Sequence, residues 1–250
     1  MPTACLFPGQ GSQSKGMGAA LFDRYPDWTA VADAVLGYSV RDLAVDDPAG
    51  QLGLTAFTQP ALFVVNALSY RARQDAGAPA PDVVAGHSLG EYNALVAAGA
   101  LDFETGLRLV RRRGAIMGQV TGGGMSAVVG LDPDRITAVL EGTDAGRRVD
   151  VANFNSFEQT VIAGPLDDLA AVKPDLTAAG ARVIPLKVSA PFHSRYMREA
   201  QAEFAAALAD AEFGAFQIPV IANVTARPYE AAGADERPLA PDPAQPRQQV

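Results

Sequence analysis

The chain has 250 residues, of which 48% are hydrophobic and 19% charged, so it can bury a large core and is too apolar for a disordered protein. Its formal net charge is −8, from 28 acidic and 20 basic residues, which argues against nucleic-acid binding. Cys5 is the single cysteine, so neither an internal disulfide nor a cysteine metal cluster can form. No secretory signal and no membrane span are visible, and we expect a soluble, cytoplasmic protein without membrane partners.

The first 123 residues alternate short apolar strands with helices. Strands are predicted at 4–7 and 83–85, because each apolar run stops at a loop that contains glycine. Helices are predicted by apolar residues at helical spacing and by their end signals, over 17–35 with a break near Pro26, over 60–73 with Pro60 in the first turn, over 91–98, and from Asp102 onward.

A different pattern of predicted strands and helices begins after three consecutive glycines, Gly122 to Gly124. Residues 124–189 alternate in the order β-α-β-β-α-β, which is the arrangement of ferredoxin-like domains. The elements are expected at 125–130, 133–140, 149–153, 159–163, 166–179 and 181–188. We therefore predict an α/β fold in which a large parallel-sheet domain of the α/β-hydrolase type (1–123 and 190–227) contains this inserted small subdomain.

The large domain resumes with a helix predicted over 195–208 and a strand over 218–223. The final 23 residues, 228–250, hold five Pro and five Ala, and we expect this tail to be irregular.

The clearest chemical motif is Gly86-His87-Ser88-Leu89-Gly90, between an apolar strand and a helix. In a nucleophile elbow the serine lies on a strained strand-to-helix turn, and small flanking residues relieve crowding. The Leu89 N–H then lies at a helix N-terminus, where it can stabilise an oxyanion. The sequence therefore predicts Ser88 as a nucleophile, with an ordinary glycine-rich turn as the less favoured alternative.

A serine nucleophile needs a base, and the sequence contains two histidines. His87 lies within the elbow, where its side chain is expected to point away from the serine. His193 is the other imidazole, and we predict that it is the general base.

Several strings together resemble the malonyl-CoA:acyl-carrier-protein transacylases and the acyltransferases of polyketide synthases, in particular those that act in trans. These strings follow one another in the family's order between residues 4 and 228. They are Phe7 to Gln13, Gly86 to Tyr92, Arg113-Gly114, Gly124-Met125, Asn153 to Ser156, and Ala190 to Ser194.

The resemblance implies a role for each matching residue. Ser88 corresponds to the nucleophile and His193 to its base, while Gln10 and Leu89 correspond to the positions whose backbone amides form the oxyanion hole. Arg113 corresponds to the arginine that binds the malonyl carboxylate, and a planar guanidinium can do so with two parallel hydrogen bonds. Bulk at Phe192 implies a preference for malonyl over methylmalonyl.

The implied reaction is malonyl transfer from coenzyme A, through a seryl ester, to the phosphopantetheine thiol of an acyl carrier protein. The implied partners are that carrier protein and the coenzyme A thioester, and neither a metal nor a bound cofactor is expected. The family's continuation after the Asn223 strand, which includes a glutamine whose carbonyl orients the histidine, is not recognisable here. Two alternatives stay open: an acyl hydrolase of the same fold and, because of this truncated or divergent end, an inactive remnant or docking module.

Overall fold

The computed structural model describes residues 1–229 and 247–248. Over this part of the chain, contacts group the residues into two compact units. The first unit contains Met1–Ile116, Phe204–Asn223 and residues 227–229, and the second contains Met117–Glu203, Val224–Ala226 and residues 247–248. The boundaries at 123 and 190 that the sequence suggested stay a prediction.

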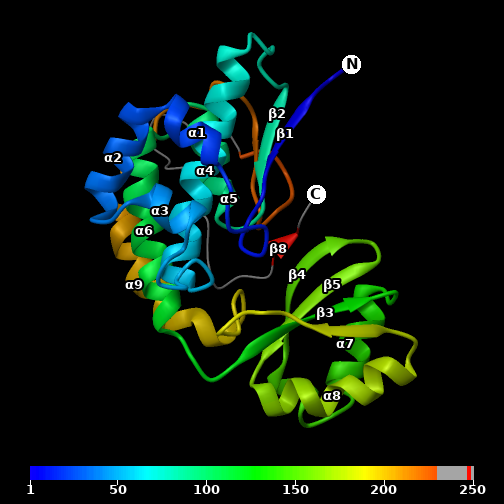
Figure 1. The fold of residues 1–250 in the computed structure, drawn as a ribbon. Coiled ribbons are helices and arrows are strands. Elements are labelled where there is room, and N and C mark those ends of the chain that lie inside the picture. The colour runs from blue at the N-terminus through cyan, green and yellow to red at the C-terminus, as the bar shows by residue number, and fades with distance from the viewer. Residues whose placement is uncertain (230–246, 249–250) are drawn as a thin grey trace. The chain divides into compact units, whose positions relative to one another are not determined.

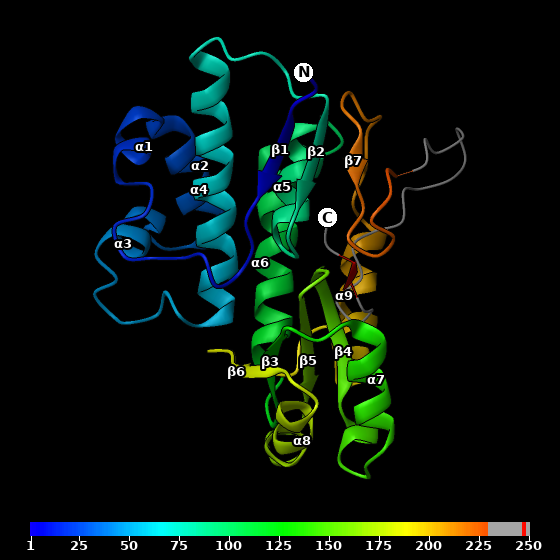
Figure 2. The ribbon, with the colours of Figure 1, turned by 90° about the vertical axis from the view of Figure 1, so that its right-hand side faces the viewer.

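The first unit is built on a parallel sheet with the strand order β1-β2-β7. Helix α5 packs against β1 and β2, and α4 packs against α5, as both ribbon views show (Figures 1 and 2). Helices α6 and α9 each contain residues of both units. The elements are β1 (Ala4–Phe7), α1 (Ala19–Arg24), α2 (Pro26–Leu36), α3 (Val40–Val45), α4 (Thr55–Asp75), β2 (Val83–Gly86), α5 (Gly90–Ala97), α6 (Phe103–Gln119), α9 (Arg198–Ala209) and β7 (Val220–Ile221).

The second unit is built on a sheet with the strand order β6-β3-β5-β4-β8. Strands β3 to β6 pair antiparallel, and β8 pairs parallel with β4. The elements are β3 (Gly124–Val129), α7 (Pro133–Glu141), the 3-10 helix η1 (Gly146–Arg148), β4 (Asp150–Ser156), β5 (Gln159–Gly164), α8 (Leu166–Ala178), β6 (Arg182–Pro185), the 3-10 helix η2 (Arg195–Met197) and β8 (Arg247–Gln248). The order β-α-β-β-α-β from β3 to β6, together with the parallel sheet of the first unit, confirms the predicted fold class.

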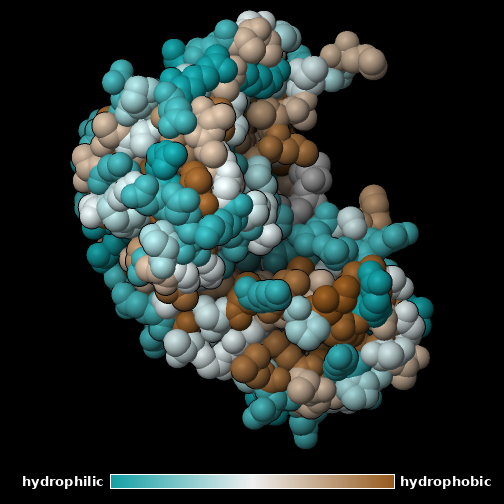
Figure 3. Space-filling view, in the orientation of Figure 1, coloured by the Kyte–Doolittle hydropathy of each residue, from teal (hydrophilic) through white to brown (hydrophobic). Residues whose placement is uncertain are grey.

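One face of the second unit's sheet is covered by α7 and α8. Val128 and Val183 point to this face and belong to a buried cluster with residues of both helices. Ile184 pairs with Ala127, so its side chain lies on the opposite face, where it stays 39% exposed. Figure 3 shows apolar surface in brown over this unit. The helices therefore cover one face of the sheet, and on the other face Ala127 is buried while Ile184 of β6 stays partly exposed.

Three predicted elements have different limits in the structure. Helix α4 begins at Thr55, five residues before Pro60, which lies inside the helix. The strand expected over 181–188 is limited to β6, because only Arg182–Pro185 pair with β3. The strand expected over 218–223 is reduced to β7.

Much of the tail that the sequence predicts to be irregular, 230–246 and 249–250, lies outside the described residues. Its first residues pack on the first unit, where the Tyr229 ring stacks on Phe216 at 5.5 Å between centroids. Among the residues that the structure describes, no helix has both the length and the apolar character to cross a bilayer.

Candidate active site

The segment around Ser88 forms a sharp turn between β2 and α5. Strand β2 ends at Gly86 and α5 begins at Gly90, so three residues join them. Ser88 has φ of +54°, a left-handed conformation that is strained for a residue other than glycine. The serine is 8% exposed. This strained, buried serine between a strand and a helix has the geometry of a nucleophile elbow.

The two glycines of the elbow allow close backbone contacts. A Cβ on Gly86 would overlap the backbone of Gly90, and a Cβ on Gly90 would overlap the carbonyl oxygen of Phe7. The elbow is therefore packed directly against the end of β1, which carries the loop that contains Gln10.

We expect Gly90→Ala to destabilise the protein by about 1–3 kcal/mol, as overpacking in a tight site does, and to lower Tm by several degrees. The matched control is Gly53→Ala, because a Cβ there meets no atom within 4 Å, and its stability should change by less than about 1 kcal/mol. Thermal melts of both variants test this. Equal melting temperatures for the two variants would show that the close contact at Gly90 is unimportant.

The backbone amides of the elbow are held in different ways. The Gly90 N–H donates to the His87 carbonyl at 2.9 Å, and the Glu91 N–H donates to the Ser88 carbonyl at 3.1 Å. The Ser88 N–H donates to Oδ1 of Asn223 at 2.7 Å. Three of the four amides from Ser88 to Glu91 are thus engaged, and the fourth is that of Leu89 at the N-cap of α5.

The side chain beside the Ser88 hydroxyl is Arg113, from α6. Its Nη2 donates to the serine Oγ at 3.1 Å, and its Nη1 donates to Oε1 of Gln59 at 2.7 Å. The guanidinium lies 5.9 Å from the ring centroid of Tyr92. Arg113 is 1% exposed, whereas the neighbouring Arg112 is exposed. A fixed, buried cation beside a nucleophilic hydroxyl can bind an anionic group of an acyl substrate.

The loop after β1 is tied to the same region. Asn66 donates from Nδ2 to the Pro8 carbonyl at 3.1 Å, and Gln10 donates from Nε2 to Oγ1 of Thr55 at 3.2 Å. The His87 N–H donates to the Phe7 carbonyl at 2.9 Å. The loop that contains Gln10 is therefore held at the elbow by hydrogen bonds with Asn66 and Thr55 of α4 and with His87, the residue after β2.

His193 and Phe192 lie in the second unit and are both 4% exposed. His193 has φ of +60°. The residues that follow bind this segment to β4 and η1. The backbone N–H and Nε of Arg195 donate to Asp150 of β4, each at 2.7 Å, and the Tyr196 hydroxyl donates to the carbonyl of Arg148 in η1 at 2.7 Å. The imidazole is thus carried on a backbone that is anchored on its C-terminal side.

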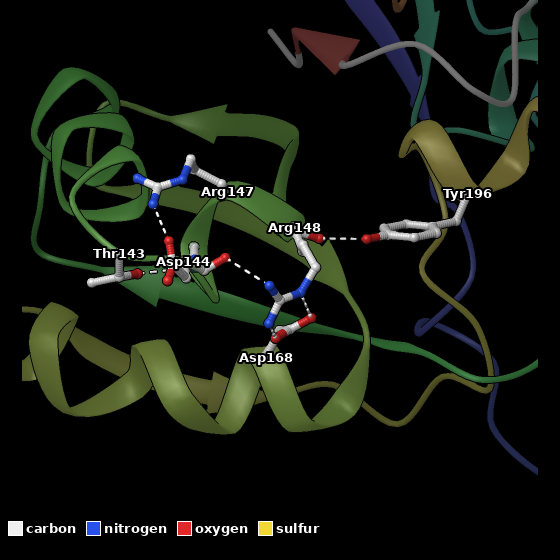
Figure 4. A network of polar contacts seen from close by, with 7 residues as sticks. Thr143, Asp144, Arg147, Arg148, Asp168 and Tyr196 are labelled. Carbon is white, nitrogen blue, oxygen red and sulfur yellow. Dashed lines mark hydrogen bonds and ion pairs between the residues drawn. The ribbon is translucent and has the colours of Figure 1, made fainter.

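The Tyr196 contact belongs to a larger polar network (Figure 4). The Arg148 guanidinium binds both carboxylate oxygens of Asp168, at 2.9 Å from Nε and 2.5 Å from Nη2, and Arg147 pairs with Asp144. The hydrogen bonds from Arg148 hold the pKa of Asp168 below its ordinary value. The network therefore joins α8 to the chain between α7 and β4.

We expect Asp168→Asn to lower stability at neutral pH and to have no effect in acid. A folded-state pKa below the unfolded value stabilises the protein above the unfolded pKa of about 3.9, and this stabilisation is lost as the pH falls through the folded pKa. Urea unfolding of both proteins between neutral and acid pH tests this. The control is Asp175→Asn, a substitution at an exposed position of the same helix. A loss of unfolding free energy in Asp168→Asn that is the same at every pH would contradict the prediction.

The structure brings together four of the six residues predicted for the site. Ser88, Leu89 and Arg113 meet at the elbow, with Gln10 on the adjoining loop, all in the first unit. His193 and Phe192 are in the second unit, so the approach of His193 to Ser88 stays a prediction.

Sequence reasoning missed two polar residues of this site, Gln59 and Asn223. The available signal was an amide side chain within an otherwise apolar stretch. That signal does not say which group the amide binds.

Comparison with known proteins agrees with this geometry. The model of the family described as "Acyl transferase domain" matches residues 5–241. The chain is 53% identical over 227 residues to the polyketide biosynthesis protein ThaF of Burkholderia thailandensis, a match that covers 90% of the chain and 20% of ThaF. It is 50% identical over 234 residues to the polyketide biosynthesis malonyl CoA-acyl carrier protein transacylase BaeC of Bacillus velezensis, covering 91% of the chain and 79% of BaeC.

Among solved structures, the malonyl CoA-acyl carrier protein transacylase of Burkholderia pseudomallei matches with a TM-score of 0.93 and 50% identity, covering 99% of the chain and 85% of that protein. The chain thus spans a small part of ThaF and most of the single transacylases. The family match covers far more than half of the sequence, and the chain belongs to the acyl transferase domain family.

Proposed function

We propose that the chain transfers a malonyl group from coenzyme A to an acyl carrier protein. The observation that carries this proposal is the buried guanidinium of Arg113, 3.1 Å from the Ser88 hydroxyl. The free carboxylate of malonyl can accept two parallel, charge-assisted hydrogen bonds from a planar guanidinium, whereas an uncharged acyl group offers no such acceptor. The names of BaeC and of the Burkholderia pseudomallei transacylase support the same substrate.

In the first half of the reaction, Ser88 Oγ attacks the thioester carbonyl of malonyl-CoA. Its proton passes to His193, the carbon–sulfur bond breaks, and the coenzyme A sulfur takes that proton from the imidazole. Malonyl is left as an ester on Ser88, and its carboxylate stays on Arg113. Holding the distal carboxylate fixes the carbonyl over the serine, which makes the attack effectively unimolecular.

The negative charge that develops on the carbonyl oxygen is stabilised by the N–H groups of Leu89 and Gln10. The other elbow amides are engaged within the protein, and the Leu89 N–H also benefits from the positive end of the α5 dipole. Removing one such donor in other enzymes costs about 2.7–4 kcal/mol of transition-state stabilisation.

In the second half, the thiol of a phosphopantetheine arm attacks the ester. His193 takes the thiol proton and returns it to Ser88 Oγ as the ester bond breaks, so the enzyme is regenerated. The chemistry is carried by side chains and backbone, and we propose that it needs no metal or bound organic cofactor. Phe192 is proposed to disfavour the branched methylmalonyl group. The pathway is proposed to be a cytoplasmic polyketide or fatty acid synthesis in which the chain acts in trans.

The test is incubation with malonyl-, methylmalonyl- and acetyl-CoA, with and without a phosphopantetheinylated carrier protein. We expect malonyl on the carrier faster than free malonate appears, and slower loading of the other two acyl groups. Release of malonate at the same rate with and without the carrier would instead identify a hydrolase. No acyl product in either arm would identify an inactive relative.

A further inference from the structure

The side chain of Asn223, which follows β7, lies against the backbone of the elbow. We infer that Asn223 is a positioning residue for Ser88, and that the acceptor and donor of its amide fix the turn from which the hydroxyl projects. This inference rests on the proposed role of Ser88 as nucleophile.

The Asn223 amide bridges the two ends of the turn. Its Oδ1 accepts from the Ser88 N–H at 2.7 Å, and its Nδ2 donates to the Gly86 carbonyl at 2.5 Å. These two backbone groups lie on either side of His87. An uncharged amide is a side chain that offers an acceptor and a donor at the same time, so it matches both ends of the turn.

Asn223 is itself held in place. Its backbone N–H donates to Oε1 of Glu91 at 2.9 Å, and the Tyr229 hydroxyl donates to the same oxygen at 2.8 Å. Glu91, in the first turn of α5, is fully buried, and Asn223 is 4% exposed. The helix that follows the nucleophile and the segment after β7 that contains Asn223 are thereby joined, so the amide has little freedom to move away from the elbow.

The strained conformation of Ser88 gives these hydrogen bonds a function. A left-handed residue that is not glycine persists where its surroundings over-determine it, and the bond to its N–H is a direct constraint on φ. Because Asn223 accepts from the Ser88 N–H, that donor is already engaged within the protein. Loss of the bridge would let the turn relax and move the hydroxyl relative to Arg113.

The charge of the bridging group provides a test. In Asn223→Asp, the ionised carboxylate still accepts from the Ser88 N–H but presents a second oxygen to the Gly86 carbonyl, and the two oxygens repel each other. Once protonated, the acid donates to that carbonyl as the amide does. Burial near Glu91 raises the pKa of such a carboxyl. We therefore expect the introduced carboxyl to take up its proton at a pH at which the enzyme can be assayed.

The experiment compares malonyl loading of wild type, Asn223→Asp and Asn223→Ala from about pH 8.5 to about pH 5.5, the range in which a buried carboxyl takes up a proton. Each rate is divided by the wild-type rate at the same pH, which removes the titration of the base. At high pH we expect kcat of both variants to be lower by about 10- to 100-fold, the effect of a small misplacement at a reacting centre. KM should change little, because Arg113 still binds the carboxylate.

As the pH falls, the relative rate of Asn223→Asp should rise and that of Asn223→Ala should stay flat. Thermal melts at each pH identify any loss of folded protein. A flat ratio for Asn223→Asp, or wild-type kcat in Asn223→Ala, would overturn the inference while wild-type loading of Ser88 continued. If the wild type forms no malonyl ester, the proposed function fails, and the same ratios measured with a fluorophosphonate probe for Ser88 still decide the role of Asn223.

Discussion

Replacement of His193 by asparagine is expected to lower the rate of malonyl loading by about 100- to 10,000-fold, the usual contribution of a positioned general base. Asparagine tolerates the left-handed conformation of this position better than most residues, so the backbone can stay as it is. Its amide cannot accept the proton of Ser88. Single-turnover loading from malonyl-CoA, followed by intact-protein mass, measures the effect.

The fold should survive this substitution, because Arg195 and Tyr196 anchor the same segment through Asp150 and the Arg148 carbonyl. A melting temperature close to that of the wild type is therefore the first control. Added imidazole should partly restore the rate in a His193→Gly variant, where a cavity replaces the ring. Loading at the wild-type rate by the folded asparagine variant would show that another group removes the proton.

Replacement of Arg113 by alanine is expected to change the acyl preference as well as the rate. Loss of a buried hydrogen-bonded charge partner costs roughly 2–4 kcal/mol, which corresponds to about 30- to 1,000-fold in kcat/KM for malonyl-CoA. Acetyl-CoA has no carboxylate to lose, so its kcat/KM should fall much less. The ratio of the two values, measured with both thioesters under the same conditions, is the readout.

Two variants sharpen this test. Arg113→Lys keeps the charge but not the planar pair of donors, so it should recover a part of the malonyl preference. Arg112→Ala removes the exposed neighbour and should leave the malonyl-to-acetyl ratio unchanged, whatever it does to coenzyme A binding. A ratio that is equal in Arg113→Ala and wild type would rule out Arg113 as the carboxylate-binding residue.

The elbow could be predicted from the sequence because its determinants are local. An apolar strand, two glycines around His87, Ser88 and Leu89, and a helix after them lie within one short stretch, and each has a direct steric reason. The β-α-β-β-α-β order of the second unit was predictable for a similar reason, since short apolar runs alternate with helical patterns in its sequence. By contrast, the start of α4 was placed too late. Proline is common in the first turn of a helix, but Pro60 lies inside α4, with Gln59 and Thr58 fully buried on the preceding turn.

The partners of the elbow could not be predicted from local patterns. Asn223 reaches Ser88 only because β7 pairs with β2 in the parallel sheet. Gln59 reaches Arg113 only because α4 and the part of α6 that contains Arg113 belong to the same unit. Both are single polar side chains far along the chain from the groups that they bind, and neither charge nor periodicity distinguishes them from other polar residues. The role of Arg113 itself came from the resemblance to a family, and its near-complete burial is the structural property that the run of arginines did not reveal.

The most direct measurement is the intact mass of the protein after brief exposure to malonyl-CoA, with peptide mapping of the modified residue and a Ser88→Ala variant treated in parallel. The account predicts one added malonyl group, located on Ser88, removed by a phosphopantetheine thiol and absent from the variant. A malonyl group on another residue, or equal labelling of the variant, would contradict it.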